Sequence, residues 1–161
     1  MSLRVLQIVP GTSVDGPGLR TSVYLAGCCH RCQGCHNPSS WDFASGREMK
    51  AEEVAEIVIS HGFNMTLTGG DPLMHPDLDE LEKLVRLVRA SGLKTWVYTG
   101  FTYEQLTAHA ELRSLLPLFD AIVDGPFIES RRSPSLPFRG SDNQRIIRPD
   151  GLVITEFDNP L

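Results

Sequence analysis

The sequence predicts a single α/β domain with a mostly parallel sheet, and three observations lead to this fold class. Its 161 residues suit one domain, because single hydrophobic cores span roughly fifty to two hundred residues. Short apolar segments alternate with segments of helical periodicity, which is typical of a parallel sheet covered by helices. A glycine follows each of four predicted strands. A complete eight-stranded (β/α) barrel needs about 250 residues, so a barrel here would be an incomplete TIM-like (β/α) barrel.

Four segments have strand character, rich in β-branched and apolar residues and ended by glycine. These predicted strands are 19–26, 64–68, 94–99 and 120–124. Functional sites of parallel α/β proteins are built at the carboxyl ends of the strands. The residues that follow each strand are therefore the first candidates for a site.

Three helices are predicted between these strands. The first covers about 51–60, and no clear cap precedes it. The second begins after Asp77, with Glu80 placed to complete a capping box, and the third begins after Thr102, with Gln105 in the same role. The third is expected to run to about Leu115. Segment 130–147 is rich in Pro, Ser, Gly and Arg and is expected to form a loop leading into an extra strand.

Composition and charge exclude several classes of protein. With 41% hydrophobic and 22% charged residues, the chain has the composition of a globular protein and is too apolar for disorder. A formal net charge of -5 argues against general binding to nucleic acid or to a membrane surface. Apolar runs stay shorter than the roughly 18 residues of a membrane span, and the amino terminus lacks a convincing leader. We expect a cytoplasmic protein.

All four cysteines lie within eight residues, at Cys28, Cys29, Cys32 and Cys35. Such a cluster cannot staple distant segments by disulfides, so it indicates metal ligation in a reducing compartment. Three of them form a C-x3-C-x2-C pattern. Glycine and proline residues around the pattern favour a loop over a helix with a cysteine stripe.

Three thiolates point to an iron-sulfur cluster with one open iron, since clusters that only carry electrons normally have four cysteine ligands. An open iron can bind and reduce a small molecule. A zinc site of the three cysteines with His36 or His30 is the alternative, and spacing alone does not exclude it.

The cysteine pattern is the signature of radical S-adenosylmethionine (SAM) enzymes. The longer pattern Gly-Cys-x-His-x-Cys-x-Gly-Cys-His-Asn-Pro-x-x-Trp, at 27–41, resembles the family of activating proteins of anaerobic ribonucleotide reductase. Four other segments carry the same resemblance, at 15–20, 68–73, 123–127 and 139–144. The resemblance implies a radical SAM domain over 1–161, with a core of about 15–147 and a partial barrel fold.

The resemblance also implies the cofactors and their residues. Cys28, Cys32 and Cys35 would hold a [4Fe-4S] cluster, while Cys29 takes no ligand role. Gly69, Gly70 and Asp71 would bind the methionyl end of SAM; His36 and Asn37 would lie near the cluster or SAM; Thr99, Asp124 and Asn143 are candidates for ribose, adenine or a partner loop. No side chain is expected to act as a catalytic acid or base, because the cofactor carries the chemistry.

The implied reaction is the transfer of one electron to SAM, which yields a 5′-deoxyadenosyl radical that takes hydrogen from a glycine Cα of a large reductase subunit. Activation of another glycyl-radical enzyme, such as pyruvate formate-lyase, is the alternative; a small-molecule radical SAM enzyme or a non-catalytic zinc module would be a different class. Segment 131–148 carries five arginines and one acid, and we expect it to dock the reductase or an acidic electron donor such as flavodoxin. A partial barrel would also leave one side open to a macromolecular substrate.

Overall fold

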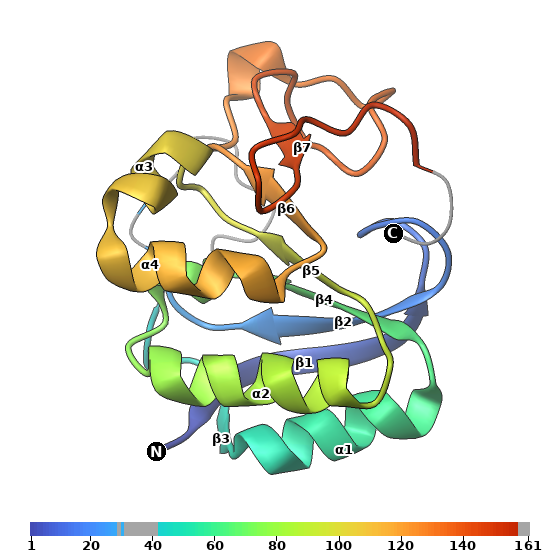
Figure 1. Cartoon of the computed structure of the whole chain (residues 1–161), viewed down its shortest axis with the longest axis vertical. Helices are drawn as coiled ribbons and strands as arrows, with labels where there is room; N and C mark the ends of the chain where they lie inside the picture. Colours follow the sequence, from blue (N-terminus) through green and yellow to red (C-terminus); the bar gives the residue numbers. More distant parts are fainter. Residues whose placement is uncertain (29, 31–41, 158–161) are drawn as a thin grey trace.

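The computed structural model describes residues 1–28, 30 and 42–157, and these residues form one seven-stranded sheet. Its strands are β1 (Leu3–Thr12), β2 (Arg20–Leu25), β3 (Arg47–Met49), β4 (Asn64–Gly69), β5 (Thr95–Tyr98), β6 (Ala121–Asp124) and β7 (Arg145–Ile147). Their order across the sheet is β3-β1-β2-β4-β5-β6-β7. In Figure 1 the strands fan from β3 and β1, near the amino terminus, to β6 and β7 beside the carboxy-terminal segment.

The centre of the sheet is parallel and its edges are antiparallel. Strands β2, β4, β5 and β6 run in one direction, with Val23 opposite Leu67 and Leu67 opposite Val97. β1 and β7 pair antiparallel with the outer members of this group, and β3 pairs antiparallel with β1. The predicted α/β class and the extra strand after 130 are thus confirmed. The strand order has two ends, β3 and β7, and does not itself show a TIM-like barrel.

The helices are α1 (Ala51–His61), α2 (Leu78–Ala90), α3 (Tyr103–Ala108) and α4 (Ala110–Leu115), with short 3₁₀ turns η2 (Pro72–Met74), η3 (Leu116–Leu118) and η4 (Glu129–Arg131). The α2 and α3 starts are as predicted, since Asp77 and Thr102 accept from the main-chain N–H of Glu80 and Gln105. The predicted third helix is wrong in one respect: it is interrupted at His109, whose backbone is extended. Across residues 1–28, 30 and 42–157, no helix is long and apolar enough to cross a membrane.

The cap of α1 comes from another helix. The Glu80 carboxylate on α2 accepts from the main-chain N–H of Ala51 at 2.8 Å, while Glu53 accepts from Lys50 N–H. Helix amino termini leave four N–H groups without intrahelical partners, and a buried acceptor satisfies one of them. A cap supplied from a distant part of the chain leaves no local sequence signal.

The two faces of the sheet are covered differently. One face packs against the helices through a cluster of aliphatic residues that includes Val23, Leu67, Val97 and Ile122 from the strands and Val54, Val58, Leu81, Leu84 and Leu106 from the helices. Alternate residues of β5, β6 and β7 point to the other face, as the two-residue period of a strand requires. There Trp96, Ala121, Val123 and Ile146 pack with Ile154, Phe138 and Phe157 of the carboxy-terminal part. Packing of Trp96, Phe138 and Phe157 therefore covers this face over β5 to β7, and the expected open side of a partial barrel stays a prediction.

Candidate functional site

The first cysteine of the motif lies where the parallel centre of the sheet ends. Gly27 and Cys28 follow β2, and the side chain of Cys28 is half-buried. A Cβ on Gly27 would overlap the ring of Phe43, so the chain needs glycine at this turn. The other predicted ligands and their neighbours, Cys29, Cys32, Cys35, His36 and Asn37, lie outside the described residues, and their roles stay predictions.

The glycine pair after β4 lies directly against this turn. Gly70 N–H donates to the Leu25 carbonyl at 2.7 Å, and Asp71 N–H donates to the Gly27 carbonyl at 2.8 Å. A Cβ on Gly70 would overlap the Gly27 backbone, and one on Gly69 would come within 2.5 Å of Leu25 backbone atoms. Glycine is thus required here for the close approach of two main chains, which fixes the backbone just before Cys28.

The Asp71 carboxylate accepts four hydrogen bonds from the chain itself. Its Oδ2 lies 2.7 Å from His30 Nε2 and accepts from Thr99 Oγ1 and Gly100 N–H, both at 2.9 Å. Its Oδ1 accepts from Leu73 N–H at 3.0 Å. The residue is only 1% exposed. A single carboxylate therefore joins the cysteine segment to the ends of β4 and β5.

His30 is the functional candidate that the sequence did not single out for this position. Its ring contacts Phe101 edge-on at 4.9 Å between centroids, and a Cβ on Gly100 would overlap the ring. Since Asp71 Oδ2 accepts from two other donors, we assign the Nε2 proton to the imidazole, which then donates to the carboxylate. The sequence did carry a signal for this role, because His30 occupies one of the specified positions of the 27–41 pattern.

Thr99 and Asp124 lie at the ends of β5 and β6, as predicted for site residues, and both are committed to internal contacts. Thr99 Oγ1 donates to Asp71 and accepts from Phe101 N–H at 3.1 Å. Asp124, 1% exposed, accepts from Tyr103 N–H at 2.8 Å and from Arg145 through both its main-chain N–H and its guanidinium. Their predicted contacts with SAM would have to coexist with these bonds.

Arg145 joins two carboxylates across the edge of the sheet. Its guanidinium contacts Glu104 at 2.7 Å and Asp124 at 2.5 Å. Hydrogen bonds to Glu104 and then Asp124 raise the pKa of Arg145 above its ordinary value. The same contact lowers the pKa of Glu104. Because Arg131 also pairs with Asp142, two of the five arginines of 131–148 are neutralised within the chain.

Asn143 retains an acceptor that the described residues leave without a partner. Its Nδ2 donates to the Pro126 carbonyl at 2.8 Å, whereas its Oδ1 is buried and makes no hydrogen bond with them. Buried polar atoms are nearly always hydrogen-bonded in folded proteins. Among Thr99, Asp124 and Asn143, Asn143 is therefore the candidate whose side chain keeps an acceptor without a partner among the described residues.

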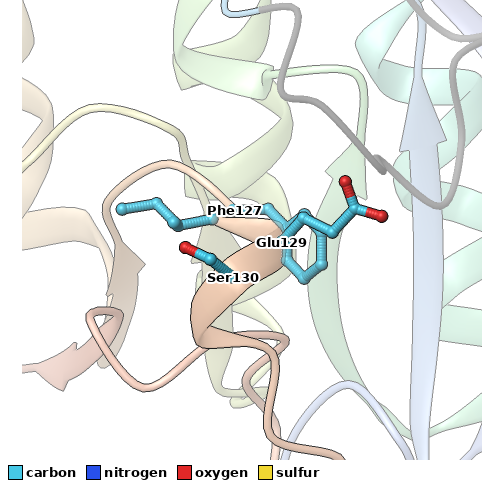
Figure 2. A pocket seen from close by; sticks show the side chains of 4 residues that line it. Phe127, Glu129 and Ser130 are labelled. Atoms are coloured by element: carbon cyan, nitrogen blue, oxygen red, sulfur yellow. The ribbon is translucent and has the colours of Figure 1, made fainter.

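A pocket of about 490 Å³ lies beside the segment that follows β6. Phe127, Ile128, Glu129 and Ser130 line it, and Figure 2 shows the Glu129 carboxylate and the Ser130 hydroxyl pointing in opposite directions. All four residues come from one segment, and none is a predicted site residue. Its lining alone does not identify a ligand.

The chemistry of this edge fits an iron-sulfur cofactor. A half-buried thiol at a strand end supplies a ligand atom that iron prefers, and the preceding Gly27 is bonded to the main chain of the buried Asp71. Within residues 1–28, 30 and 42–157, no group of three or more His, Cys, Asp or Glu side chains could hold a metal ion by itself. The ligand roles of Cys28, Cys32 and Cys35 therefore stay predictions.

Comparison with known proteins decides the family. A family model described as a 4Fe-4S single cluster domain matches residues 14–147. A protein of Pasteurella multocida is 36% identical over 154 residues, covering 91% of this chain and 98% of its own length, and one of Escherichia coli K12 is 36% identical over 148 residues, covering 86% and 94%. Both are named anaerobic ribonucleoside-triphosphate reductase-activating protein. This chain belongs to that family.

A relative with the same name is encoded by a phage. The relative from Enterobacteria phage T4 carries the same name and is 34% identical over 146 residues, covering 87% of this chain and 90% of its own length. The family's 4Fe-4S description favours the cluster that three thiolates predicted over the zinc site that spacing left open.

A solved structure has a fold similar to that of this chain. The crystal structure of QueE from Escherichia coli superposes with a TM-score of 0.51 at 19% identity, over 63% of this chain and 54% of that one. At this identity the likeness shows a shared fold alone. It agrees with a mixed α/β sheet whose central strands are parallel.

Proposed function

We propose that this chain is a radical SAM activase that generates a glycyl radical on anaerobic ribonucleoside-triphosphate reductase. One observation carries the proposal: relatives with this name match almost their full length, including 98% of the Pasteurella multocida protein. The C-x3-C-x2-C pattern and the position of Cys28 at a strand end support it.

Cys28, Cys32 and Cys35 are the proposed ligands of a [4Fe-4S] cluster. When bound, the reduced cluster would supply one electron to the SAM sulfonium, and cleavage of the S–C5′ bond would give methionine and a 5′-deoxyadenosyl radical able to take a hydrogen atom from a glycine Cα. The chain contributes binding, orientation and exclusion of water.

SAM is proposed to lie at the carboxyl ends of β4, β5 and β6. The main chain of Gly69 and Gly70 would face its methionyl end, and the remaining acceptor of Asn143 would suit a ribose hydroxyl or an adenine amino group. The roles given to Thr99 and Asp124 are kept as contacts with SAM that do not displace their internal bonds.

The proposed domain is one radical SAM unit over 1–161, with its sheet as the wall of an incomplete (β/α) barrel. Four adjacent parallel strands, each followed by a site segment on the same edge, support this architecture. The fold likeness to QueE is consistent with it.

An acidic reductant such as flavodoxin is proposed to dock on the arginine-rich segment. Arg132 and Arg148 are exposed. Arg131 and Arg145 instead pair with acidic side chains of the chain itself. Complementary charge speeds the encounter of protein partners, and salt screens it. Arg132→Glu should slow reduction by flavodoxin at low ionic strength; an unchanged rate and salt dependence would contradict this docking site.

The function is tested by anaerobic reconstitution, with iron and sulfide analysis followed by SAM cleavage under reduction. Wild type should bind iron and sulfide and release methionine and 5′-deoxyadenosine. Cys32→Ala should abolish cleavage, and Cys29→Ala, its matched control, should largely preserve it. Zinc in place of iron, or a loaded protein that cleaves no SAM, would contradict the proposal.

A further inference from the structure

The hydrogen bonds of the Asp71 side chain indicate a function that SAM binding does not explain. Four donors of the chain occupy it, and one of them, His30, lies two residues after the proposed cluster ligand Cys28. Thr99 and Gly100 supply two others from the end of β5. The group is a connection between three segments at the place where the cofactor would bind.

We propose that Asp71 acts through His30 as a positioning residue, which holds the Cys28 segment at the ends of β4 and β5, and that its side chain does not bind the SAM ammonium group. The proposal rests on the proposed function, because the held segment carries a cluster ligand.

The hydrogen-bonding capacity of Asp71 supports this assignment. Each oxygen of an ionised carboxylate offers about two lone-pair sites. His30, Thr99 and Gly100 all contact Oδ2, which fills the sites of that oxygen, and Leu73 N–H occupies one site of Oδ1. At 1% exposure the side chain is also closed to an outside cation. A SAM ammonium group could bind Oδ2 only by displacing one of these buried bonds.

The contacts that hold the His30 ring support the same assignment. The ring is held at its Nε2 by Asp71, on one side by the Phe101 ring, and against Gly100, where a Cβ would overlap it. Its side chain is 16% exposed. A ring restrained from several directions fixes the main chain that carries it.

The short sequence separation makes the restraint relevant to the cluster. Consecutive Cα atoms are about 3.8 Å apart, so the Cys28 Cα lies within roughly 8 Å of that of His30. Groups that orient metal ligands typically alter metal affinity by about 10- to 100-fold when they are removed. Loss of either partner should therefore loosen the hold on iron.

The test compares iron release from the reconstituted full chain in the presence of a chelator, together with the electron paramagnetic resonance (EPR) signal of the reduced cluster. His30→Ala and Asp71→Asn should each release iron about 10- to 100-fold faster than wild type. The double variant should be no faster than the faster single one, because both changes break one connection. His30→Gln, whose amide nitrogen can replace Nε2, should restore most of the wild-type rate.

Two matched controls separate this effect from general destabilisation. His61→Ala removes an exposed histidine at the end of α1, and Asp120→Asn alters a carboxylate that accepts from Thr95 N–H at the opposite end of the strands. Both should release iron at the wild-type rate. Fast release from Asp120→Asn would overturn the proposal, since any loss of stability would then loosen the cluster.

Titration of the EPR signal with SAM distinguishes the alternative role. Asp71→Asn with normal iron release but weakened SAM binding, and His30→Ala without effect, would overturn the proposal and make Asp71 a SAM ligand. Variants identical to a loaded wild type would overturn the positioning role alone. A wild type that takes up no cluster would defeat the proposed function and this proposal together.

Discussion

Asp71 and Asp124 are two buried carboxylates that lie at strand ends on the same edge of the sheet. Each is 1% exposed, each accepts main-chain N–H bonds, and each joins its strand end to two other segments. They differ in their side-chain donors. Asp124 meets the guanidinium of Arg145, whereas Asp71 meets the imidazole of His30 and the hydroxyl of Thr99.

This difference separates stability from function. The bonds of Asp124 join β6, α3 and β7, which are parts of the fold distant from the cysteine motif in sequence. The bonds of Asp71 reach into the motif itself. A buried carboxylate at a strand end is therefore not sufficient to identify a ligand site, and the donors that converge on it indicate its role.

The largest expected loss of stability follows from Asp124→Ala. Removal of this carboxylate leaves the guanidinium of Arg145 without its buried partner and the N–H of Tyr103 without its acceptor. Breaking a buried ion pair by removing one partner costs about 3–5 kcal/mol, discounted toward the lower figure because Arg145 is partly exposed. Urea denaturation of the protein measures it; a loss below about 1 kcal/mol would show that Asp124 is not a structural connection.

Gly70→Ala and Gly125→Ala compare the glycines beside the two carboxylates. The Gly70 substitution should cost about 3 kcal/mol, because its Cβ would overlap the Gly27 main chain, which cannot move independently. A Cβ on Gly125, which has φ +91°, would lie 3.7 Å from its nearest neighbour, Asn143 Nδ2. Alanine at this position should therefore cost only backbone strain, about 1–2 kcal/mol. Thermal or urea unfolding of both variants checks the order; equal losses would contradict the close approach at Gly70.

Thr99→Val should lower the free energy of unfolding by about 1 kcal/mol. Valine keeps the shape of the side chain but removes the donor to Asp71 and the acceptor for Phe101 N–H. Iron release should accelerate less than in His30→Ala, because His30 still holds Asp71. Release faster than in His30→Ala would mean that Thr99 is the main restraint.

The smallest effect is expected from Glu104→Gln, and it depends on pH. Arg145 lowers the pKa of Glu104 in the folded protein, so this contact stabilises the fold above the ordinary pKa of 4.5 and is lost as the pH falls through the lowered value. The difference in stability between wild type and variant should be small at neutral pH and should vanish in acid. A difference in stability between wild type and Glu104→Gln that grows on acidification would contradict the prediction for this contact.

The predicted strands and helices follow from local patterns, and the errors arise where local patterns are weak. Segment 64–68 and the helix after Asp77 were recognised from strand composition and capping residues, which act within a few positions. β1 was missed because its polar interruptions and register shifts blur the alternation of a strand. The break at His109 was missed because α3 and α4 together continue one helical pattern.

The strand-end positions of the candidate site residues could be predicted from the sequence, but their contacts could not. Glycines after each strand placed Asp71, Thr99 and Asp124 at one edge of the sheet, where the structure has them. Their partners could not be read from the sequence, because His30 and Arg145 are 41 and 21 residues away from the carboxylates they bind. Side-chain pairing over such separations depends on sheet order.

The most direct test of the proposed activity is the EPR spectrum of anaerobic ribonucleoside-triphosphate reductase after incubation with the reduced, cluster-loaded protein and SAM. The expected result is a glycyl radical signal on the reductase that requires both SAM and the intact cysteine motif, and that is absent with Cys32→Ala. A loaded protein that cleaves SAM but leaves the reductase without a radical would contradict the assignment of this reductase as its substrate.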